Sequence, residues 1–239
     1  MSFRFLTWLR CLLLLALMAP GPLLAFGRAK TDGITFAASP GKLYLPVNEA
    51  ANRLRWSVQR DEAGHAVALN QVPLPAGSLR QLLDGTELVS MDTLQAAGAA
   101  VSAPAEDGAV TVGRGWRRLL VRPGAQRVEV SLPNQQLQAW QGDRLILQTH
   151  ISSGKNGATP AGSFAAGPYR AKMHRSSLYN NAPMPWSVQI RGHVFIHGYT
   201  SVPRYPASHG CIRMPLTNGN PARFFYEWVQ SGTPVQVVK

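Results

Sequence analysis

The sequence contains only two cysteines, Cys11 and Cys211, among 239 residues. Two thiols exclude a disulfide-rich scaffold. Cys11 lies in an N-terminal apolar run that we expect to be removed on export or held in a membrane, so Cys211 has no disulfide partner in the chain. A lone thiol in an oxidising compartment has to pair between chains or do chemistry. Cys211 is therefore the first candidate for a reactive side chain, and inert packing as a small hydrophobe is the alternative.

Acidic residues are also scarce, because 12 Asp and Glu stand against 24 Lys and Arg, a formal net charge of +12. The imbalance belongs to one half of the chain. Residues 123–239 contain eleven Lys and Arg against three acids, whereas residues 31–122 contain nine of each. Outside the cytoplasm such a basic half suits anionic wall polymer, peptide carboxylates or lipid headgroups. Neither a helix-turn-helix pattern nor interleaved arginine and aromatic residues points to DNA, so we expect no nucleic-acid partner.

No apolar run is long enough to cross a bilayer comfortably, since a transmembrane helix needs about 20 apolar residues. The run at residues 11–18 follows two arginines and precedes a Pro-Gly-Pro turn and Ala25. This is the layout of a secretory signal peptide. We assign residues 1–25 as a signal peptide, cleaved after Ala25 or Ala29, with an uncleaved signal anchor as the alternative. The mature protein is then expected in the periplasm or cell envelope.

Residues 31–115 contain a weak internal repeat with an offset of roughly 44 residues, a period typical of stacked supersecondary units. Strand, helix and strand patterns occur at 43–45, 47–54 and 66–69, and recur at 88–91, 92–97 and 109–112. This order resembles the small α+β stalk module at the N-terminus of copper amine oxidases. The module has no cysteine and one histidine, His65, so we expect a spacer or wall-binding role without copper, separable from catalysis.

Residues 116–126 are rich in Arg, Gly and Pro and are expected to be a linker to a second domain, 127–239. The pattern of this second domain is mostly β, with alternating apolar residues and frequent turns. Only one helix is clear: Asn220 can cap it, Pro221 suits its first turn, and apolar residues share a face through Val229. The predicted fold is a mostly β domain with one clear helix, preceded by a small α+β repeat module.

Two segments near the C-terminus bring together a histidine and a cysteine. His197 and Gly198 follow a strand-like apolar run, and residues 208–214 read Ser-His-Gly-Cys-Ile-Arg-Met. A thiol needs a base or a positive neighbour to become a thiolate near neutral pH, and an imidazole supplies both functions. Gly198 and Gly210 allow close approach of the backbone, and the turn before Cys211 can point its N–H groups at a developing oxyanion. The pattern therefore predicts nucleophilic catalysis by a Cys/His pair.

These segments resemble the motif of the L,D-transpeptidase catalytic domain of the YkuD type, which is His-Gly, a short loop, and Ser/Thr-His-Gly-Cys followed by Ile-Arg. The resemblance covers about residues 127–239. Other stretches also look like family landmarks: residues 152–155, 159–164, 182–186, 202–207 and 232–235. The resemblance implies a β-sandwich and a cysteine acyltransferase that uses neither a cofactor nor a metal.

Carried over residue by residue, the resemblance implies that Cys211 is the nucleophile and His197 its base. The carbonyl of Gly198 would orient His197. His209 stands beside the thiol in the motif and is expected to shape the pocket.

The substrate-binding residues implied by the same motif are Ser208, Gly210, Arg213 and Tyr179. Arg213 follows Cys211 by two, so in an extended strand their side chains share a face. We expect Arg213 to hold a substrate carboxylate, with a structural salt bridge as the alternative. Tyr179 is a candidate for the oxyanion hole, because some family members place a tyrosine hydroxyl there.

By this resemblance, the thiolate attacks the bond between an L-configured centre and D-Ala in a peptidoglycan stem tetrapeptide. D-Ala leaves, and the thioester passes to an amine. The acceptor can be a second stem peptide, an envelope protein or a free D-amino acid, which gives crosslinking, protein anchoring or exchange. The alternatives are an L,D-carboxypeptidase that uses water, and a non-catalytic wall-binding protein.

Rival sites fit the sequence less well. His193, His197, His209 and Cys211 could be combined into a zinc site, but a strand places residues four apart about 13 Å from each other, at roughly 3.3 Å per residue. A sortase needs a long separation between His and Cys and a different approach to the cysteine. Papain-like peptidases place the cysteine before the histidine.

Overall fold

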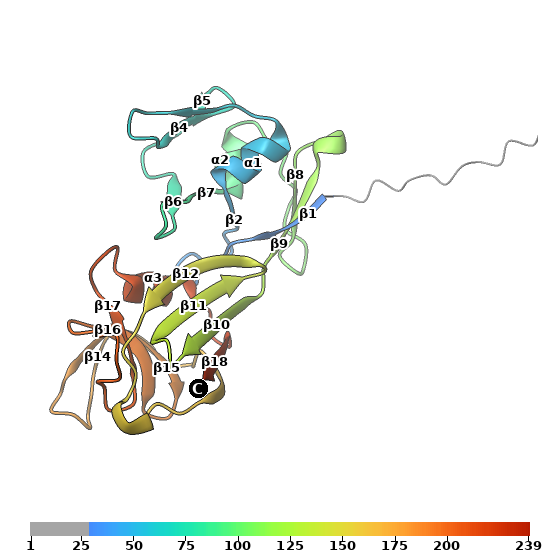
Figure 1. Cartoon of the computed structure of the whole chain (residues 1–239). Helices are drawn as coiled ribbons and strands as arrows, with labels where there is room; N and C mark the ends of the chain where they lie inside the picture. The colour runs from blue at the N-terminus through green and yellow to red at the C-terminus, as the bar shows by residue number, and fades with distance from the viewer. Residues whose placement is uncertain (1–28) are drawn as a thin grey trace, which may run out of the picture.

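The computed structural model describes residues 29–239, so the predicted signal peptide, residues 1–25, lies outside the described residues. Within 29–239, no helix has the length and apolar character needed to span a membrane. Figure 1 shows two lobes, with β2 to β8, α1 and α2 in one and β10 to β18 with α3 in the other. Strands β1 and β9 run between the lobes.

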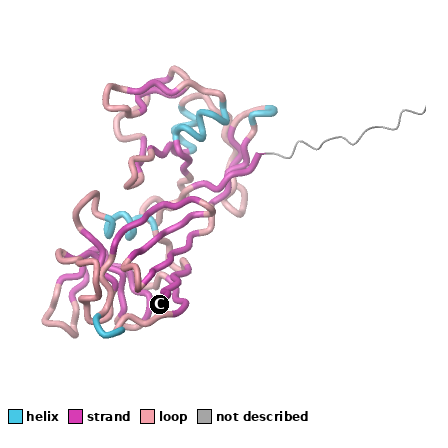
Figure 2. The backbone as a smooth tube through the Cα atoms, viewed as in Figure 1, coloured by secondary structure: helices cyan, strands magenta, loops and turns pink. Residues whose placement is uncertain are grey.

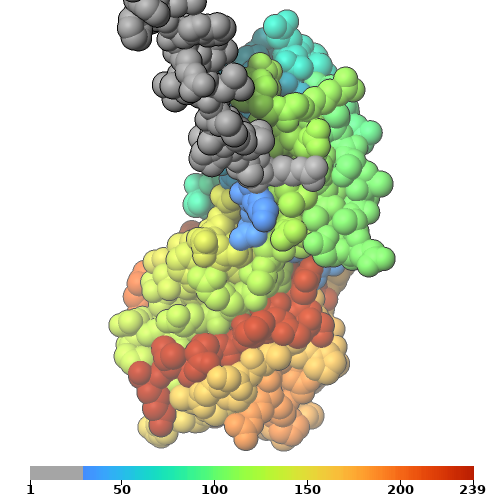
Figure 3. Space-filling view, turned by 90° about the vertical axis from the view of Figure 1, so that its right-hand side faces the viewer, coloured from blue at the N-terminus to red at the C-terminus, as the bar shows by residue number. Residues whose placement is uncertain are grey.

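Two sheets build the C-terminal lobe. One has the strand order β12-β11-β10-β18-β13 and the other β14-β15-β16-β17. The strands are β10 (Gln126–Ser131), β11 (Gln136–Gln141), β12 (Arg144–His150), β13 (Gly162–Ala165), β14 (Arg170–Arg175), β15 (Pro183–Arg191), β16 (Val194–Tyr199), β17 (Ile212–Pro215) and β18 (Pro234–Val238). In Figure 3 the red strand β18 lies between the green-yellow and orange segments of its neighbours, as the parallel pairing with β10 and the antiparallel pairing with β13 require.

Alternation along the strands explains the layered core. In β10, Val128 and Val130 are buried while Arg127 and Glu129 are exposed, which is the period-two pattern of a strand with one face on a core. Figure 2 shows how little helix this lobe contains. The predicted fold class is confirmed: the C-terminal half is mostly β.

The one clear helix of this half is α3 (Pro221–Trp228). The Asn220 side chain accepts a hydrogen bond from the Arg223 N–H at 3.0 Å, and Pro221 occupies the first turn, where a missing N–H costs nothing. Phe225 and Trp228 are fully buried. The sequence prediction of cap, first turn and buried face is confirmed.

Three small sheets form the N-terminal part, in the orders β2-β7-β6, β3-β4-β5 and β1-β9-β8. Their elements are β1 (Ala29–Gly33), β2 (Tyr44–Pro46), α1 (Val47–Leu54), β3 (Val58–Arg60), β4 (Ala66–Leu69), β5 (Val72–Pro73), β6 (Leu79–Gln81), β7 (Glu87–Ser90), α2 (Met91–Ala96), β8 (Val110–Val112), η1 (Gly115–Arg117) and β9 (Leu119–Pro123). The short turn η2 (Lys155–Gly157) belongs to the other lobe. The predicted repeat is visible, because β2 precedes α1 as β7 precedes α2, and the two strands pair with each other.

The segment expected to be a linker, 116–126, differs from that expectation. It contains β9, whose Leu119 and Val121 are buried. β9 pairs in parallel with β1 and antiparallel with β8. The high Arg, Gly and Pro content of this stretch favours a loop. Its short apolar alternation, Leu119 and Val121, forms a strand because β1 and β8, which are distant in the sequence, pair with it.

The two lobes share a hydrophobic core. Ile34, Phe36, Tyr44, Leu82 and Leu88 pack in the same cluster as the C-terminal strands and α3. The fully buried ring of Phe36 stands edge-on to Phe224, with centroids 5.9 Å apart. This shared cluster conflicts with the expectation that the N-terminal module is separable.

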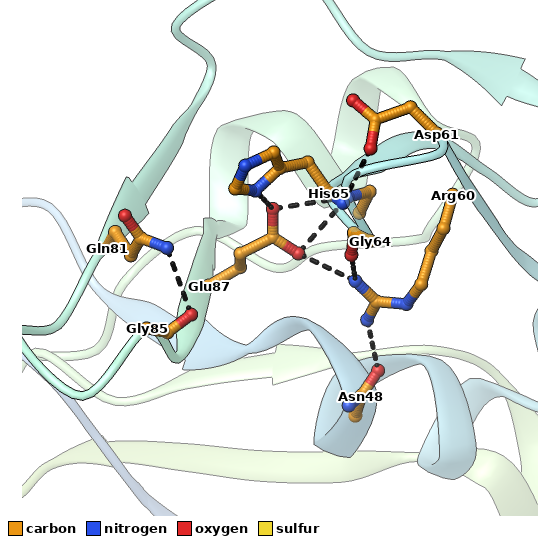
Figure 4. Close-up of polar contacts among 9 residues, drawn as sticks. Asn48, Arg60, Asp61, Gly64, His65, Gln81, Gly85 and Glu87 are labelled. Carbon is orange, nitrogen blue, oxygen red and sulfur yellow. Dashed lines mark hydrogen bonds and ion pairs between the residues drawn. The ribbon is translucent and has the colours of Figure 1, made fainter.

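A polar network connects several elements of the N-terminal part (Figure 4). Glu87 of β7 receives a hydrogen bond from the guanidinium of Arg60 at 2.9 Å and lies 3.4 Å from the ring of His65. Arg60 also donates to the carbonyl of Gly64 and to Asn48 of α1. The network therefore ties the β3–β4 hairpin to β7 and α1, and it leaves the charge of Arg60 balanced.

Candidate active site

Parallel pairing of β16 with β17 positions the candidate catalytic residues. His197 pairs with Arg213, and Ile196 pairs with Ile212. Cys211 immediately precedes β17, so this register places it beside the backbone of Phe195. Six of the predicted residues line one cavity of about 370 Å³ at this edge of the sheet: Tyr179, His197, Ser208, His209, Cys211 and Arg213. Gly198 and Gly210 lie in the backbone that carries these side chains.

His197 is held as a neutral imidazole with a defined tautomer. Its side chain is 4% exposed, and Nδ1 lies 2.8 Å from the carbonyl oxygen of Gly198. A carbonyl can only accept, so Nδ1 carries the proton and Nε2 keeps its lone pair. Burial lowers the pKa of His197 to about 4, the hydrogen bond to Gly198 opposes this change, and the charge of Arg213 adds to it. Near neutral pH the ring is therefore able to accept a proton.

Residue 198 has little room for a side chain. A Cβ on Gly198 would meet the side chains of Leu216 and Ala222. Ala222 belongs to α3, which packs against the inner face of β16. The missing side chain of Gly198 thus allows α3 to lie close to β16, and the carbonyl of Gly198 faces the imidazole of His197.

Cys211 rests as a neutral thiol. Its Sγ lies 3.5 Å from the carbonyl oxygen of His193, to which the thiol can donate. Burial raises the pKa of the Cys211 thiol, while a backbone hydrogen bond at Phe195 and the charge of Arg213 pull the pKa down. His193 contributes its backbone to this contact. Among residues 29–239, no group of three or more His, Cys, Asp or Glu is placed to hold a metal ion.

The turn before the thiol is fixed by a buried serine. Ser208 Oγ donates to the carbonyl of Cys211 at 2.6 Å and accepts from the Gly210 N–H at 3.0 Å. Gly210 has φ +140°, a backbone conformation that a side chain would strain. Ser208 and Gly210 are therefore elements of the turn that presents Cys211.

A second loop, which contains Thr159, is hydrogen-bonded to this turn. Its role was not predicted from the sequence. Thr159, 2% exposed, donates from its hydroxyl to the carbonyl of Gly210 at 2.8 Å and accepts from the Gly154 N–H at 2.7 Å. In a trans peptide the C=O and the following N–H point in opposite directions. The Cys211 N–H therefore points away from Thr159, and no hydrogen bond found within 29–239 uses it. The Thr-Pro pair at residues 159–160 was the available signal in the sequence.

His209 and Tyr179 form an aromatic wall of the cavity. Their rings stack with centroids 4.4 Å apart and planes 16° apart. Tyr179 is 44% exposed and comes from the loop between β14 and β15. The structure thus brings both predicted residues to the cavity, with the Tyr179 ring resting on His209.

Arg213 lies over an aromatic ring and has no carboxylate partner in the described part of the chain. Its guanidinium carbon is 4.1 Å from the centroid of the Tyr199 ring. None of the ion pairs within residues 29–239 includes Arg213. Tyr199 also stands edge-on to His197 at 6.1 Å. The sequence analysis missed Tyr199, although a residue two positions after His197 on a strand shares its face.

Comparison with known proteins gives one matching family model. Residues 125–237 match the family model described as YkuD, the L,D-transpeptidase catalytic domain. Among curated proteins, none matches the chain.

Solved structures similar to the chain include several L,D-transpeptidases. One from Xylanimonas cellulosilytica is 30% identical with a TM-score of 0.43, and the match covers 49% of this chain and 64% of that one. One from Mycobacterium smegmatis is 15% identical with a TM-score of 0.44, covering 89% and 96%. The catalytic domain of the L,D-transpeptidase from E. faecium is 25% identical with a TM-score of 0.40, covering 48% of this chain and 98% of that one. The chain spans less than two thirds of the Xylanimonas relative.

Proposed function

We propose that this protein is a peptidoglycan L,D-transpeptidase in which Cys211 is the nucleophile and His197 the base. The observation that carries the proposal is a single cavity lined both by a half-buried thiol and by an imidazole whose Nδ1 is committed to the Gly198 carbonyl. This leaves Nε2 as the acceptor in the same cavity as the thiol. A binding protein has no need for this arrangement, so the proposal is preferred over a non-catalytic wall-binding role.

In the acylation step, His197 Nε2 takes the proton from Cys211 Sγ as the sulfur attacks the carbonyl of the L-configured residue. The negative charge that develops on the carbonyl oxygen faces the free N–H of Cys211, which acts as an oxyanion donor. The tetrahedral intermediate then collapses. The C–N bond to D-Ala breaks, His197 gives its proton to the leaving amine, and a thioester remains on Cys211.

In the second step, a neutral acceptor amine attacks the thioester carbonyl. The amine loses a proton to His197, the C–S bond breaks, and the proton returns to the sulfur. The product carries a new amide bond, which is a crosslink, a protein anchor or an exchanged D-amino acid according to the acceptor. Water in place of the amine gives carboxypeptidase action.

The resting pair is neutral in this mechanism. The pKa of His197 is lowered and the pKa of Cys211 is raised, so charge separation is unfavourable before substrate arrives. The thiolate therefore forms as the carbonyl carbon accepts the sulfur. Arg213 lines the same cavity and has no carboxylate partner within residues 29–239, which supports the proposal that it binds a stem-peptide carboxylate.

The location that suits this substrate is the periplasm or cell envelope. We propose that residues 1–25 direct export, on the evidence of their charged start, short apolar run and small residues before the cut. The natural partners are then stem peptides of the wall and, in the anchoring reaction, an envelope protein.

Incubation of the protein with a purified disaccharide tetrapeptide tests the proposal. We expect release of D-Ala and formation of a dimer in the intact protein, and neither product in Cys211→Ala. His209→Ala, which keeps the base, should retain part of the activity. Release of D-Ala without any dimer or exchange product would favour the carboxypeptidase, and no release at all would favour the binding protein.

A further inference from the structure

The arginines of the N-terminal part divide into two groups. Of the nine Lys and Arg in residues 31–122, four form ion pairs with carboxylates: Lys42, Arg60, Arg80 and Arg122. No ion pair found within residues 29–239 includes the other five, which are Arg53, Arg55, Arg114, Arg117 and Arg118. This part of the chain has no net charge, yet its five unpaired cations come from only two short segments.

These two segments meet around Trp116. The guanidinium of Arg55, just after α1, lies 4.6 Å from the centroid of the Trp116 ring, and that of Arg117 lies 5.0 Å from it. Arg117 also reaches the carbonyl of Leu54. Trp116 is 73% exposed, the most exposed large hydrophobic side chain within residues 29–239. We call Trp116 and these five exposed arginines the Arg/Trp patch.

The first described residues lie next to this patch. Ala29 pairs with Leu119, which directly follows Arg118. The preceding sequence contains three arginines, no acid and the apolar run at residues 11–18. At no more than about 3.6 Å per residue, residues 19–28 span at most about 36 Å. As long as the apolar run remains attached, a membrane that holds it is therefore within reach of the patch.

We propose that the Arg/Trp patch is a docking surface for a bilayer with anionic headgroups. Arginine binds phosphate oxygens in a fork and is weakly hydrated, which suits a partly dry headgroup region. Tryptophan is enriched at membrane interfaces, where its ring is among lipid and its N–H is near water. Stacking of Arg55 and Arg117 on the same ring keeps the cations beside the aromatic surface that would enter the interface. The catalytic lobe would thereby stay close to the membrane.

Flotation of the full chain with lipid vesicles tests this inference. The vesicles are neutral phosphatidylcholine or the same lipid with phosphatidylglycerol, each at low and high salt. Arg114→Gln with Arg118→Gln removes two exposed charges whose side chains are in no ion pair and no cation–π contact found within residues 29–239, and Trp116→Ala removes the ring. The matched control is Lys172→Gln with Lys239→Gln, which removes two exposed charges from the other lobe. Every variant keeps residues 1–28, so their contribution is common to all.

We expect the intact chain to prefer anionic vesicles and to lose that preference at high salt. At roughly fivefold per arginine, the double arginine variant should lower the partition onto anionic vesicles at low salt by about 25-fold, and the lysine control should change it much less. Trp116→Ala should weaken binding at both salt concentrations. Equal effects of the arginine and lysine pairs would overturn the proposal. So would binding to purified wall sacculi, lost in the arginine variant, without any preference for anionic vesicles.

Discussion

The hydroxyl of Thr159 donates a 2.8 Å hydrogen bond to the carbonyl of Gly210, the residue before the candidate nucleophile. This bond fixes the peptide between Gly210 and Cys211, and hence the direction of the Cys211 N–H. Gly154 belongs to the same arrangement, because a Cβ there would come within 2.9 Å of Gly210. Thr159 is therefore a positioning residue for the proposed oxyanion donor.

Thr159→Val should keep the shape of the side chain and remove this bond. Loss of an oxyanion donor costs about 10²- to 10³-fold in rate, and a misdirected donor should cost a substantial part of that. We expect acylation by the tetrapeptide to fall at least about tenfold, while alkylation of Cys211 by iodoacetamide, which has no oxyanion, changes little. Thr159→Ser should restore acylation. If the valine variant slowed both reactions alike, Thr159 would act only by supporting the turn.

Arg213→Gln separates recognition of the carboxylate from reactivity of the thiol. Charge-assisted pairs are roughly twice as strong as neutral hydrogen bonds. The variant should therefore weaken turnover of the anionic tetrapeptide much more than alkylation by a small neutral reagent. Lys172→Gln, which removes an equal charge from an exposed position outside the cavity lining, serves as the control. Equal losses in both reactions of the Arg213 variant would assign it a structural role and redirect the search to Lys155, Arg191 and Arg204.

The pH dependence of alkylation reports the resting state of the pair. Because the pKa of Cys211 is raised above its ordinary value of 9.0, the alkylation rate should keep rising beyond pH 9. Because the pKa of His197 is about 4, no step should appear near pH 6.5. Iodoacetamide rates from pH 4 to 10, with circular dichroism to verify folding, provide the measurement. A plateau already reached between pH 5 and 7 would reveal a thiolate–imidazolium pair.

Phe36→Ala tests the core shared by the two lobes. Phe36 is fully buried and contacts Phe224 of the C-terminal lobe. Truncation of a buried phenylalanine typically lowers the free energy of unfolding by about 3–5 kcal/mol. We expect one common loss of stability in denaturant melts followed by probes in either lobe. Val67→Ala, at a side chain 41% exposed, should have a small effect. Unfolding of the N-terminal part alone at lower denaturant would show that the lobes are independent.

Local signals in the sequence predicted much of the fold. Helix α1 and strand β4 occupy the residues expected from their periodicity, and the Asn220 cap and Pro221 mark the start of α3, since caps and periodicity depend on neighbouring residues. The β1–β9 pairing escaped prediction because it joins residues about 90 apart, and short apolar alternations do not identify distant partners.

In the candidate site, too, local sequence motifs were predicted and contacts between distant residues were not. A motif of adjacent residues indicated Cys211 and His197, whose shared cavity follows from the pairing of β16 with β17. The bond between Thr159 and Gly210 spans 51 positions. The stacking of Arg213 on Tyr199 likewise depends on the register of two strands. Local patterns can single out one residue of such a contact, but they do not identify its distant partner.

The most direct test of the central claim is to find the acyl group on the protein. The intact protein is mixed near neutral pH with a carbapenem, whose ring opens on attack by a thiolate and remains attached, and the adduct is located by peptide mass spectrometry. The account predicts a single adduct, on Cys211, that forms orders of magnitude more slowly in His197→Ala and is absent from Cys211→Ala. An adduct on any other residue, or one that forms at an unchanged rate without His197, would contradict it.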